Sequence, residues 1–143
     1  TKTLLPHIAT AKVDVRMVPH MEPDDVVQSI RNQLDRHGFE DIEMKVYNKY
    51  YWSKVPIKEK VVQAMIKTYQ KMGKEPQIWP VNPGSAPYYV FERYLNLPYV
   101  TGGMGHGARQ HSSEEYCTVQ GILDFEKSMA IFFENYLKEV GIE

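Results

Sequence analysis

The sequence predicts an α/β fold in which helices alternate with short strands, preceded by a smaller α+β unit. Short stretches of alternating or continuous apolar residues, which are typical of strands, are separated by longer stretches with apolar residues at helical spacing. A glycine-rich loop also lies between an apolar pair, Tyr99-Val100, and the longest helical pattern. Open α/β sheets bind their ligands at such loops, outside the carboxyl ends of the strands. We therefore expect the ligand site at this loop.

The composition excludes several classes of protein. A length of 143 residues with 43% hydrophobic residues is typical of one globular domain. Lys and Arg (17) balance Asp and Glu (18), so no basic surplus indicates a nucleic-acid or membrane partner. The single cysteine, Cys117, excludes an internal disulfide framework, and no apolar run or signal-peptide pattern indicates a membrane or secreted protein. We therefore expect a soluble, cytoplasmic protein that binds neither nucleic acid nor membranes.

The first unit is predicted to be β-α-β. In residues 8–18, Val13 and Val15 alternate with Asp14 and Arg16, as in a half-buried strand. Pro23 and two acidic residues then open a helix that ends near Gly38. The apolar face of this helix and the next alternating strand consist of Val26, Val27, Ile30 and Leu34, and of Ile42, Met44 and Val46, respectively.

The second unit is predicted to be α-β-α-β-α, one flank of a doubly wound sheet. Its expected order is helix 57–72, strand 77–81, a helix after the turn 82–87, strand 99–101 and a last helix that ends at Gly141. Two parallel strands with three helices make a poor independent domain, and the first unit is similarly incomplete. Both units are therefore interpreted as halves of larger structures.

Two residues between the main loop and the last helix, His111 and Glu115, are candidates for chemistry. His111 is either a metal ligand or general base, or a histidine that only caps a helix or bonds within the loop. Ser112 and Glu115 have the S-x-x-E spacing of a capping box, and Glu115 could in addition support a metal-bound histidine. Cys117 is expected to be a packed thiol one turn into the last helix.

Two further sites could bind a carboxylate. The Gly84-Ser85 turn is expected at a helix N-terminus, with Ser85 as N-cap, where it is either a carboxylate site or an ordinary turn. Arg16 either grips a carboxylate with two hydrogen bonds or forms a surface ion pair with Asp14. His106 and Arg109 are either polar groups of the loop or substrate contacts, and the residues alone do not separate these roles.

The order of these motifs resembles the C-terminal half of the co-catalytic zinc exopeptidases, the family of aminoacylase, acetylornithine deacetylase, succinyl-diaminopimelate desuccinylase and glutamate carboxypeptidase. The motifs are Leu5-Pro6, residues 13–19, residues 84–87 and residues 107–116. The resemblance implies that residues 1–52 are the second half of an inserted lid domain, through which many members dimerise. It implies that residues 53–143 are the C-terminal part of the catalytic α/β domain.

The resemblance also implies roles for single residues. His111 matches the last ligand of a two-zinc site, in which cobalt or manganese is also possible. Arg16 and the turn formed by Gly84, Ser85 and Ala86 match the groups that bind the substrate carboxylate, and Glu115 matches an acid that supports the metal ligand. The implied activity is zinc-dependent hydrolysis of an amide bond next to a free carboxylate, in a small peptide or an N-acyl amino acid.

The catalytic glutamate and the other metal ligands of the family match positions upstream of this chain, so no catalytic residue is assigned within it. We expect the chain to be inactive alone, to require the N-terminal half of the same enzyme, and to form a homodimer through the lid. This interpretation predicts exposed apolar surface on Tyr99-Val100 and the last helix. The alternative is a non-catalytic dimerisation or ligand-binding module derived from such an enzyme.

Overall fold

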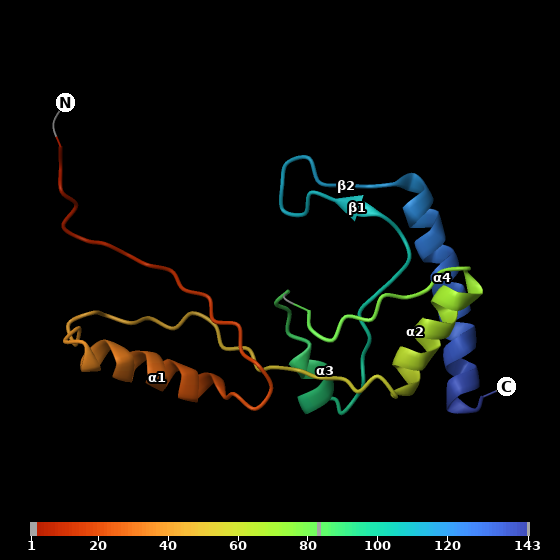
Figure 1. Cartoon of the computed structure of the whole chain (residues 1–143), viewed down its shortest axis with the longest axis horizontal. Coiled ribbons are helices and arrows are strands. Elements are labelled where there is room, and N and C mark those ends of the chain that lie inside the picture. Colours follow the sequence, from red (N-terminus) through yellow and green to blue (C-terminus); the bar gives the residue numbers. More distant parts are fainter. Residues whose placement is uncertain (1–2, 83, 143) are drawn as a thin grey trace.

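The protein consists of four helices and one small antiparallel sheet in residues 3–82 and 84–142, the residues that its computed structural model describes. Figure 1 shows α1 at one end of the molecule, α2 and α4 side by side at the other end, and α3 between them. The mixed α and β content agrees with the sequence. The elements are α1 (Pro23–Arg36), α2 (Lys60–Lys71), α3 (Tyr89–Arg93), β1 (Gly107–Ala108), β2 (Tyr116–Cys117) and α4 (Val119–Val140).

Helix α1 confirms the first predicted helix. Pro23 occupies its first turn together with two aspartates, where a missing N–H costs nothing and negative charge is favourable. On the same helix, Arg31 donates hydrogen bonds of 2.8 Å to the carbonyl oxygens of Phe39 and Ile42. These bonds hold the segment after α1 against the helix. Figure 1 shows this segment returning alongside α1.

Helices α2 and α4 form the best-packed part of the molecule. The residues of α4 buried at this contact are seven positions apart, which is the repeat of a helix that presents one seam to its neighbour. Most of the buried side chains are small, so the two helices can approach closely. The seam consists of Ala64, Met65 and Thr68 on α2 and of Ser128 and Asn135 on α4, whereas the buried Gly121 of α4 lies against the glycine-rich loop.

None of the four predicted strands forms. Residues 8–18, 42–46, 77–81 and 99–101 have no strand partner in the described part of the chain, and the only sheet there is the β1–β2 pair. Alternation of apolar and polar residues shows that a segment suits a half-buried sheet surface, but a strand also needs a neighbour for its N–H and C=O groups. The predicted β-α-β unit and the flank of a doubly wound sheet are therefore wrong for this chain as it stands.

The chain exposes far more surface than a compact protein. Its accessible area is 12,086 Å², whereas a compact monomer of this length exposes about 7,600 Å². Among the large and aliphatic hydrophobic side chains of the described ranges, only Ala64, which is 0% exposed, and Met65, which is 8% exposed, are buried. The prediction of an exposed apolar face is confirmed for α4, whereas Tyr99 and Val100 are half-buried. The exposed apolar residues of α4 include Val119, Ile122, Leu123, Phe133 and Leu137.

Candidate functional site

The glycine-rich loop lies directly on α2 and α4. The Tyr69 hydroxyl donates to the Gly103 carbonyl oxygen at 2.6 Å and accepts from the Gly103 N–H at 3.1 Å. A Cβ atom at Gly103 would lie 3.0 Å from the Phe125 ring, and one at Gly105 would lie 3.0 Å from the Gly121 carbonyl oxygen. Gly105 also has a φ of 128°, which disfavours other residues. Glycine is therefore required for this close approach.

The loop leads into the β1–β2 hairpin, which the sequence analysis did not predict. Gly107 pairs with Cys117 and Ala108 with Tyr116 in antiparallel register. Each strand is two residues long, and the turn between them contains His111. The hairpin therefore presents His111 at its tip, where the residue is exposed to solvent.

Helix α4 begins after the hairpin rather than at Ser112. Its N-cap is Thr118, whose Oγ1 accepts a 3.1 Å hydrogen bond from the Gly121 N–H. The predicted capping box at Ser112 is therefore wrong, because the chain completes the hairpin before it enters the helix. The prediction for Cys117 is wrong for the same reason, since this residue is exposed on β2. A threonine directly before an apolar helical run was the signal that could have located the cap.

The tip of the hairpin is a tight turn held by its own polar groups. Arg109 and His111 have φ angles of 62° and 65°, a left-handed conformation that is uncommon for residues with a side chain. The Ser112 N–H and hydroxyl both donate to the Arg109 carbonyl oxygen, at 3.1 and 2.8 Å. Glu115 Oε2 accepts from the His111 N–H at 3.2 Å, and Arg109 forms an ion pair with Glu114. Glu115 therefore holds the main chain of His111, and the imidazole is displayed to solvent.

This arrangement suits a single metal-ligand position. An imidazole nitrogen is a common ligand for zinc, but zinc sites use three or four protein ligands. Within residues 3–82 and 84–142, no group of three or more His, Cys, Asp or Glu side chains lies close enough together to hold a metal ion. His111 therefore fits one position of a metal site, and the remaining ligands would have to come from other residues.

The turn predicted to bind a carboxylate does not begin a helix. Helix α3 is five residues long and starts at Tyr89, so the prediction of Ser85 as N-cap is wrong. The Gly84 N–H donates to Asn82 Oδ1 at 2.8 Å, which makes this segment a local turn. Gly84 and Ser85 are exposed, and Ala86 is half-buried with its carbonyl oxygen accepting from the main chain of Tyr88.

The structure does not assemble the predicted site residues into one site. Arg16 is exposed in the segment before α1. Asp14 and Arg16 both belong to the described residues, and they form no ion pair with each other. Figure 1 shows this segment and the β1–β2 hairpin as separate features of the molecule. The roles of Arg16, His111, Glu115 and residues 84–86 toward a ligand accordingly remain predictions.

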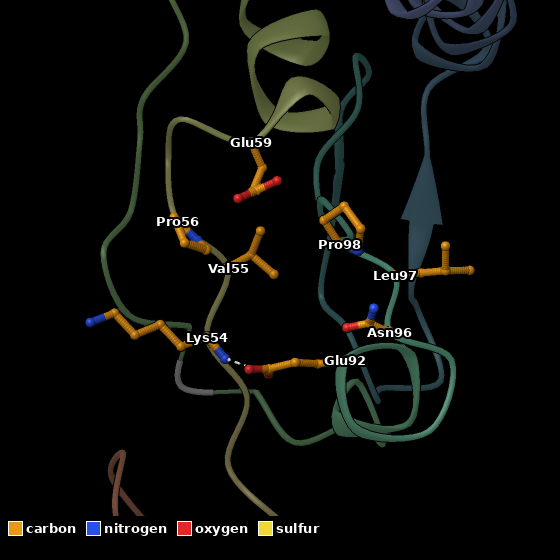
Figure 2. A pocket seen from close by; sticks show the side chains of 8 residues that line it. All are labelled: Lys54, Val55, Pro56, Glu59, Glu92, Asn96, Leu97 and Pro98. Atoms are coloured by element: carbon orange, nitrogen blue, oxygen red, sulfur yellow. Dashed lines mark hydrogen bonds between the residues drawn. The ribbon is translucent and has the colours of Figure 1, made fainter. Parts of the chain in front are cut away.

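The described surface includes two open depressions. One of about 270 Å³ lies at the base of the hairpin and includes His106, Cys117 and Phe125. The other, of about 280 Å³, lies between the segment before α2 and the end of α3, and contains none of the predicted site residues. Figure 2 shows Glu92 reaching from α3 across this depression to the main chain of Lys54.

Comparison with known proteins finds a solved structure with a similar fold. The chain is similar to a solved metallo-carboxypeptidase of the M20 family, which supports that family at a coarse level. The solved structure concerned is the M20 family metallo-carboxypeptidase Sso-CP2 from Sulfolobus solfataricus, with a TM-score of 0.69 and 28% sequence identity. The similarity covers 86% of this chain and 28% of the carboxypeptidase. No protein-family model and no curated protein sequence matches the chain.

The length of the match limits what the relative implies. This chain spans 28% of the length of that carboxypeptidase, so the activity, substrate and partners of a whole enzyme are a matter for proposal.

Among the described residues, no helix is both long and apolar enough to cross a membrane.

Proposed function

We propose that this chain forms part of a zinc-dependent hydrolase that cleaves an amide bond next to a free carboxylate. The substrate would be a small peptide or an N-acyl amino acid, and the enzyme a carboxypeptidase, dipeptidase or deacylase. The observation that carries the proposal is the similarity to a metallo-carboxypeptidase together with a histidine presented at the tip of a hairpin. In this proposal His111 supplies one zinc ligand, and Glu115 positions it through the main chain.

Arg16 and the turn formed by Gly84, Ser85 and Ala86 would bind the substrate carboxylate. An arginine suits this role because its planar guanidinium can donate two parallel hydrogen bonds to a carboxylate. The bound metal would polarise the amide carbonyl and lower the pKa of an attacking water. Other residues would supply the general base and the remaining ligands, in the proposal from the N-terminal half of the same enzyme.

The large exposed surface supports the need for a partner. Exposed apolar patches of this extent mark interaction surfaces in stable proteins. Residues 1–52 would belong to the lid and mediate homodimerisation, and residues 53–143 would complete the catalytic domain. The enzyme would act in the cytoplasm.

The proposal is tested by replacing His111 in the assembled, metal-loaded enzyme. His111→Ala should abolish hydrolysis of N-acyl amino acids and dipeptides and lower the zinc content measured by mass spectrometry, because a ligand is lost. His37→Ala is the matched control, since His37 is an exposed histidine that follows α1 and whose ring hydrogen-bonds to the Gln33 side chain. Retained activity and full zinc content in His111→Ala would refute the assignment.

Substitution of Glu115 separates two ways of supporting His111. Glu115→Gln keeps a side-chain oxygen that can accept from the His111 N–H, whereas Glu115→Ala removes it. If Glu115 acts by holding the loop, only the alanine variant should lose zinc affinity, by about 10–100-fold. Equal losses in both variants would show that the negative charge of Glu115 acts on the metal site instead.

The alternative function, a non-catalytic dimerisation or ligand-binding module, makes an opposite prediction in native mass spectrometry with zinc present. The enzyme proposal predicts a complex with a second polypeptide and about two zinc ions. The module predicts a zinc-free monomer or homodimer.

A further inference from the structure

Two neighbouring residues of α3 hold the connection between the two ends of the molecule. We define the N-terminal unit as residues 3–50, the linker as Tyr51–Lys54, and the C-terminal unit as residues 55–82 and 84–142. We propose that Glu92 and Arg93 of α3 form a clamp on the linker that fixes the orientation of the N-terminal unit relative to the C-terminal unit.

Arg93 is the part of the clamp that reaches both the linker and the N-terminal unit. Its Nη2 atom lies 3.1 Å from Glu22 Oε1, an ion pair that connects residues 71 positions apart. Its guanidinium carbon lies 4.0 Å from the ring centroid of Tyr51 and 5.7 Å from that of Trp52. A guanidinium over an aromatic face gains a cation–π attraction that an ion pair alone does not supply.

Glu92 holds the other end of the linker. Its Oε2 atom accepts from the Ser53 hydroxyl at 3.0 Å and from the Lys54 N–H at 3.2 Å. The second of these bonds is drawn in Figure 2. The Ser53 hydroxyl also lies 2.8 Å from the Tyr99 hydroxyl, so the linker is anchored to the C-terminal unit on two sides.

The orientation depends on this clamp because little else joins the two units. Helix α1 has no extensive packing against another helix or strand in the described residues. Aromatic rings also meet near the linker, with centroids 6.0 Å apart for Tyr50–Tyr89, 5.4 Å apart for Tyr51–Tyr89 and 5.3 Å apart for His20–Trp52. The buried hydrophobic side chains among the described residues, Ala64 and Met65, both lie on α2 of the C-terminal unit, and the linker is the covalent connection between the units. A few polar contacts of α3 therefore decide how the units are arranged.

The clamp has a consequence for the proposed hydrolase. Arg16 belongs to the N-terminal unit and His111 to the C-terminal unit, so their separation depends on the orientation that the clamp sets. This consequence rests on the proposed function, whereas the clamp itself does not. In that context Glu92 and Arg93 are positioning residues.

The clamp is tested with distance measurements between spin labels on the 143-residue chain. Cys117→Ser removes the natural thiol, and cysteines for labelling replace exposed Ser29 on α1 and exposed Glu126 on α4. Pulsed electron–electron double resonance should give one dominant distance between the labels at positions 29 and 126 in the parent chain. Arg93→Met should raise the population at other distances roughly tenfold, as expected for the loss of one exposed ion pair and two cation–π contacts.

Further variants make the test specific. Glu22→Gln removes the ion pair, and because Glu22 makes no side-chain cap to α1, it leaves that helix intact. Its effect should be smaller than that of Arg93→Met, and the double variant should be no worse than Arg93→Met alone. Lys71→Met, which breaks the Lys71–Glu134 pair within the C-terminal unit, is the matched control. It should leave the distance distribution between the labels on α1 and α4 unchanged.

Several results would overturn the clamp. They are a broad distance distribution in the parent chain, no change in Arg93→Met, and an equal change in Lys71→Met. A second label pair on α2 and α4 should keep its distance in every variant, and its loss in Arg93→Met would show unfolding rather than release of the N-terminal unit. Because no metal or substrate is needed, failure of the clamp is distinguishable from failure of the proposed hydrolase.

Discussion

A buried chain of hydrogen bonds between α2 and α4 is the best place to test the packing of the molecule. Asn135, which is 6% exposed, donates from Nδ2 to Thr68 Oγ1 at 3.1 Å. The hydroxyl of Thr68, which is fully buried, donates in turn to the Ala64 carbonyl oxygen at 2.7 Å. Thr68→Val keeps the shape of the side chain and removes both bonds, whereas Asn135→Ala removes one bond and leaves a cavity.

The expected changes in the free energy of unfolding follow from these contacts. Thr68→Val leaves the buried amide of Asn135 without its partner, and we expect a loss of about 1–3 kcal/mol. Asn135→Ala loses the same hydrogen bond and side-chain packing, and we expect a similar loss of about 1–3 kcal/mol. In the double variant no buried amide is left without a partner. Its loss should therefore fall short of the sum of the single losses by about 0.5–3 kcal/mol.

The assay is urea unfolding of the four proteins, followed by circular dichroism at the helical band. Comparable denaturant slopes across the set would show that the same surface is exposed on unfolding in each case. Thr68→Ser is the control, because it keeps the hydroxyl and should lose only about 1 kcal/mol for the buried methyl group. Single losses that add within about 0.3–0.5 kcal/mol would refute the coupling, since independent sites behave in this way.

Two further predictions concern the base of the hairpin and the acid stability of the helix pair. A Cβ atom at Gly121 would lie 2.7 Å from the His106 N atom, so Gly121→Ala should displace the loop from α4 and accelerate amide exchange in the hairpin; unchanged exchange would contradict this packing. Hydrogen bonds from Lys138 and then Lys71 hold the pKa of Glu134 below its ordinary value of 4.5. The stabilisation is therefore present above this value and is lost as the pH falls through the lowered folded-state pKa. Acid titration of stability should be shallower in Glu134→Gln, and parallel curves would show that the pair is inert.

The helices were predictable from the sequence because their signals are local. Pro23 fixes the start of α1, and Gly141, with a φ of 83°, ends α4 in the left-handed conformation that glycine favours. The start of α4 was missed because Ser112 and Glu115 have capping-box spacing but form the turn of a hairpin. Spacing alone does not distinguish these two uses of the same pair of residues.

The strands could not be predicted in the same way, because a strand depends on a partner distant in the sequence. Val13 and Val15 alternate with polar residues as expected of a half-buried strand, yet their side chains are 76% and 47% exposed. The pattern describes a surface suited to a sheet and does not supply the neighbouring strand. Over 86% of its length the chain nevertheless aligns with the carboxypeptidase at a TM-score of 0.69, so its course in space is similar although these pairings are absent from the described residues.

The candidate site was predictable only in part. The glycine spacing located the loop, and the loop led to His111 at the tip of the hairpin. Tyr69 could not be found in this way, because its position on α2 predicts only an apolar contact. Its hydroxyl makes two hydrogen bonds to Gly103, a residue 34 positions away, and only the packed structure brings them together.

The surface of α4 connects the unpaired strands with the proposed function. Its buried seam uses small residues against α2, whereas large apolar side chains such as Phe133, which is 61% exposed, face solvent. A helix with apolar residues on two faces is normally covered on both. In α/β proteins the second cover is a sheet, whose strands carry near-continuous apolar runs. The predicted strands 77–81 and 99–101 carry short apolar runs and lack strand partners in the described residues, so one missing sheet would account for both features. This common requirement favours a chain that completes its fold with another polypeptide segment over a self-sufficient module.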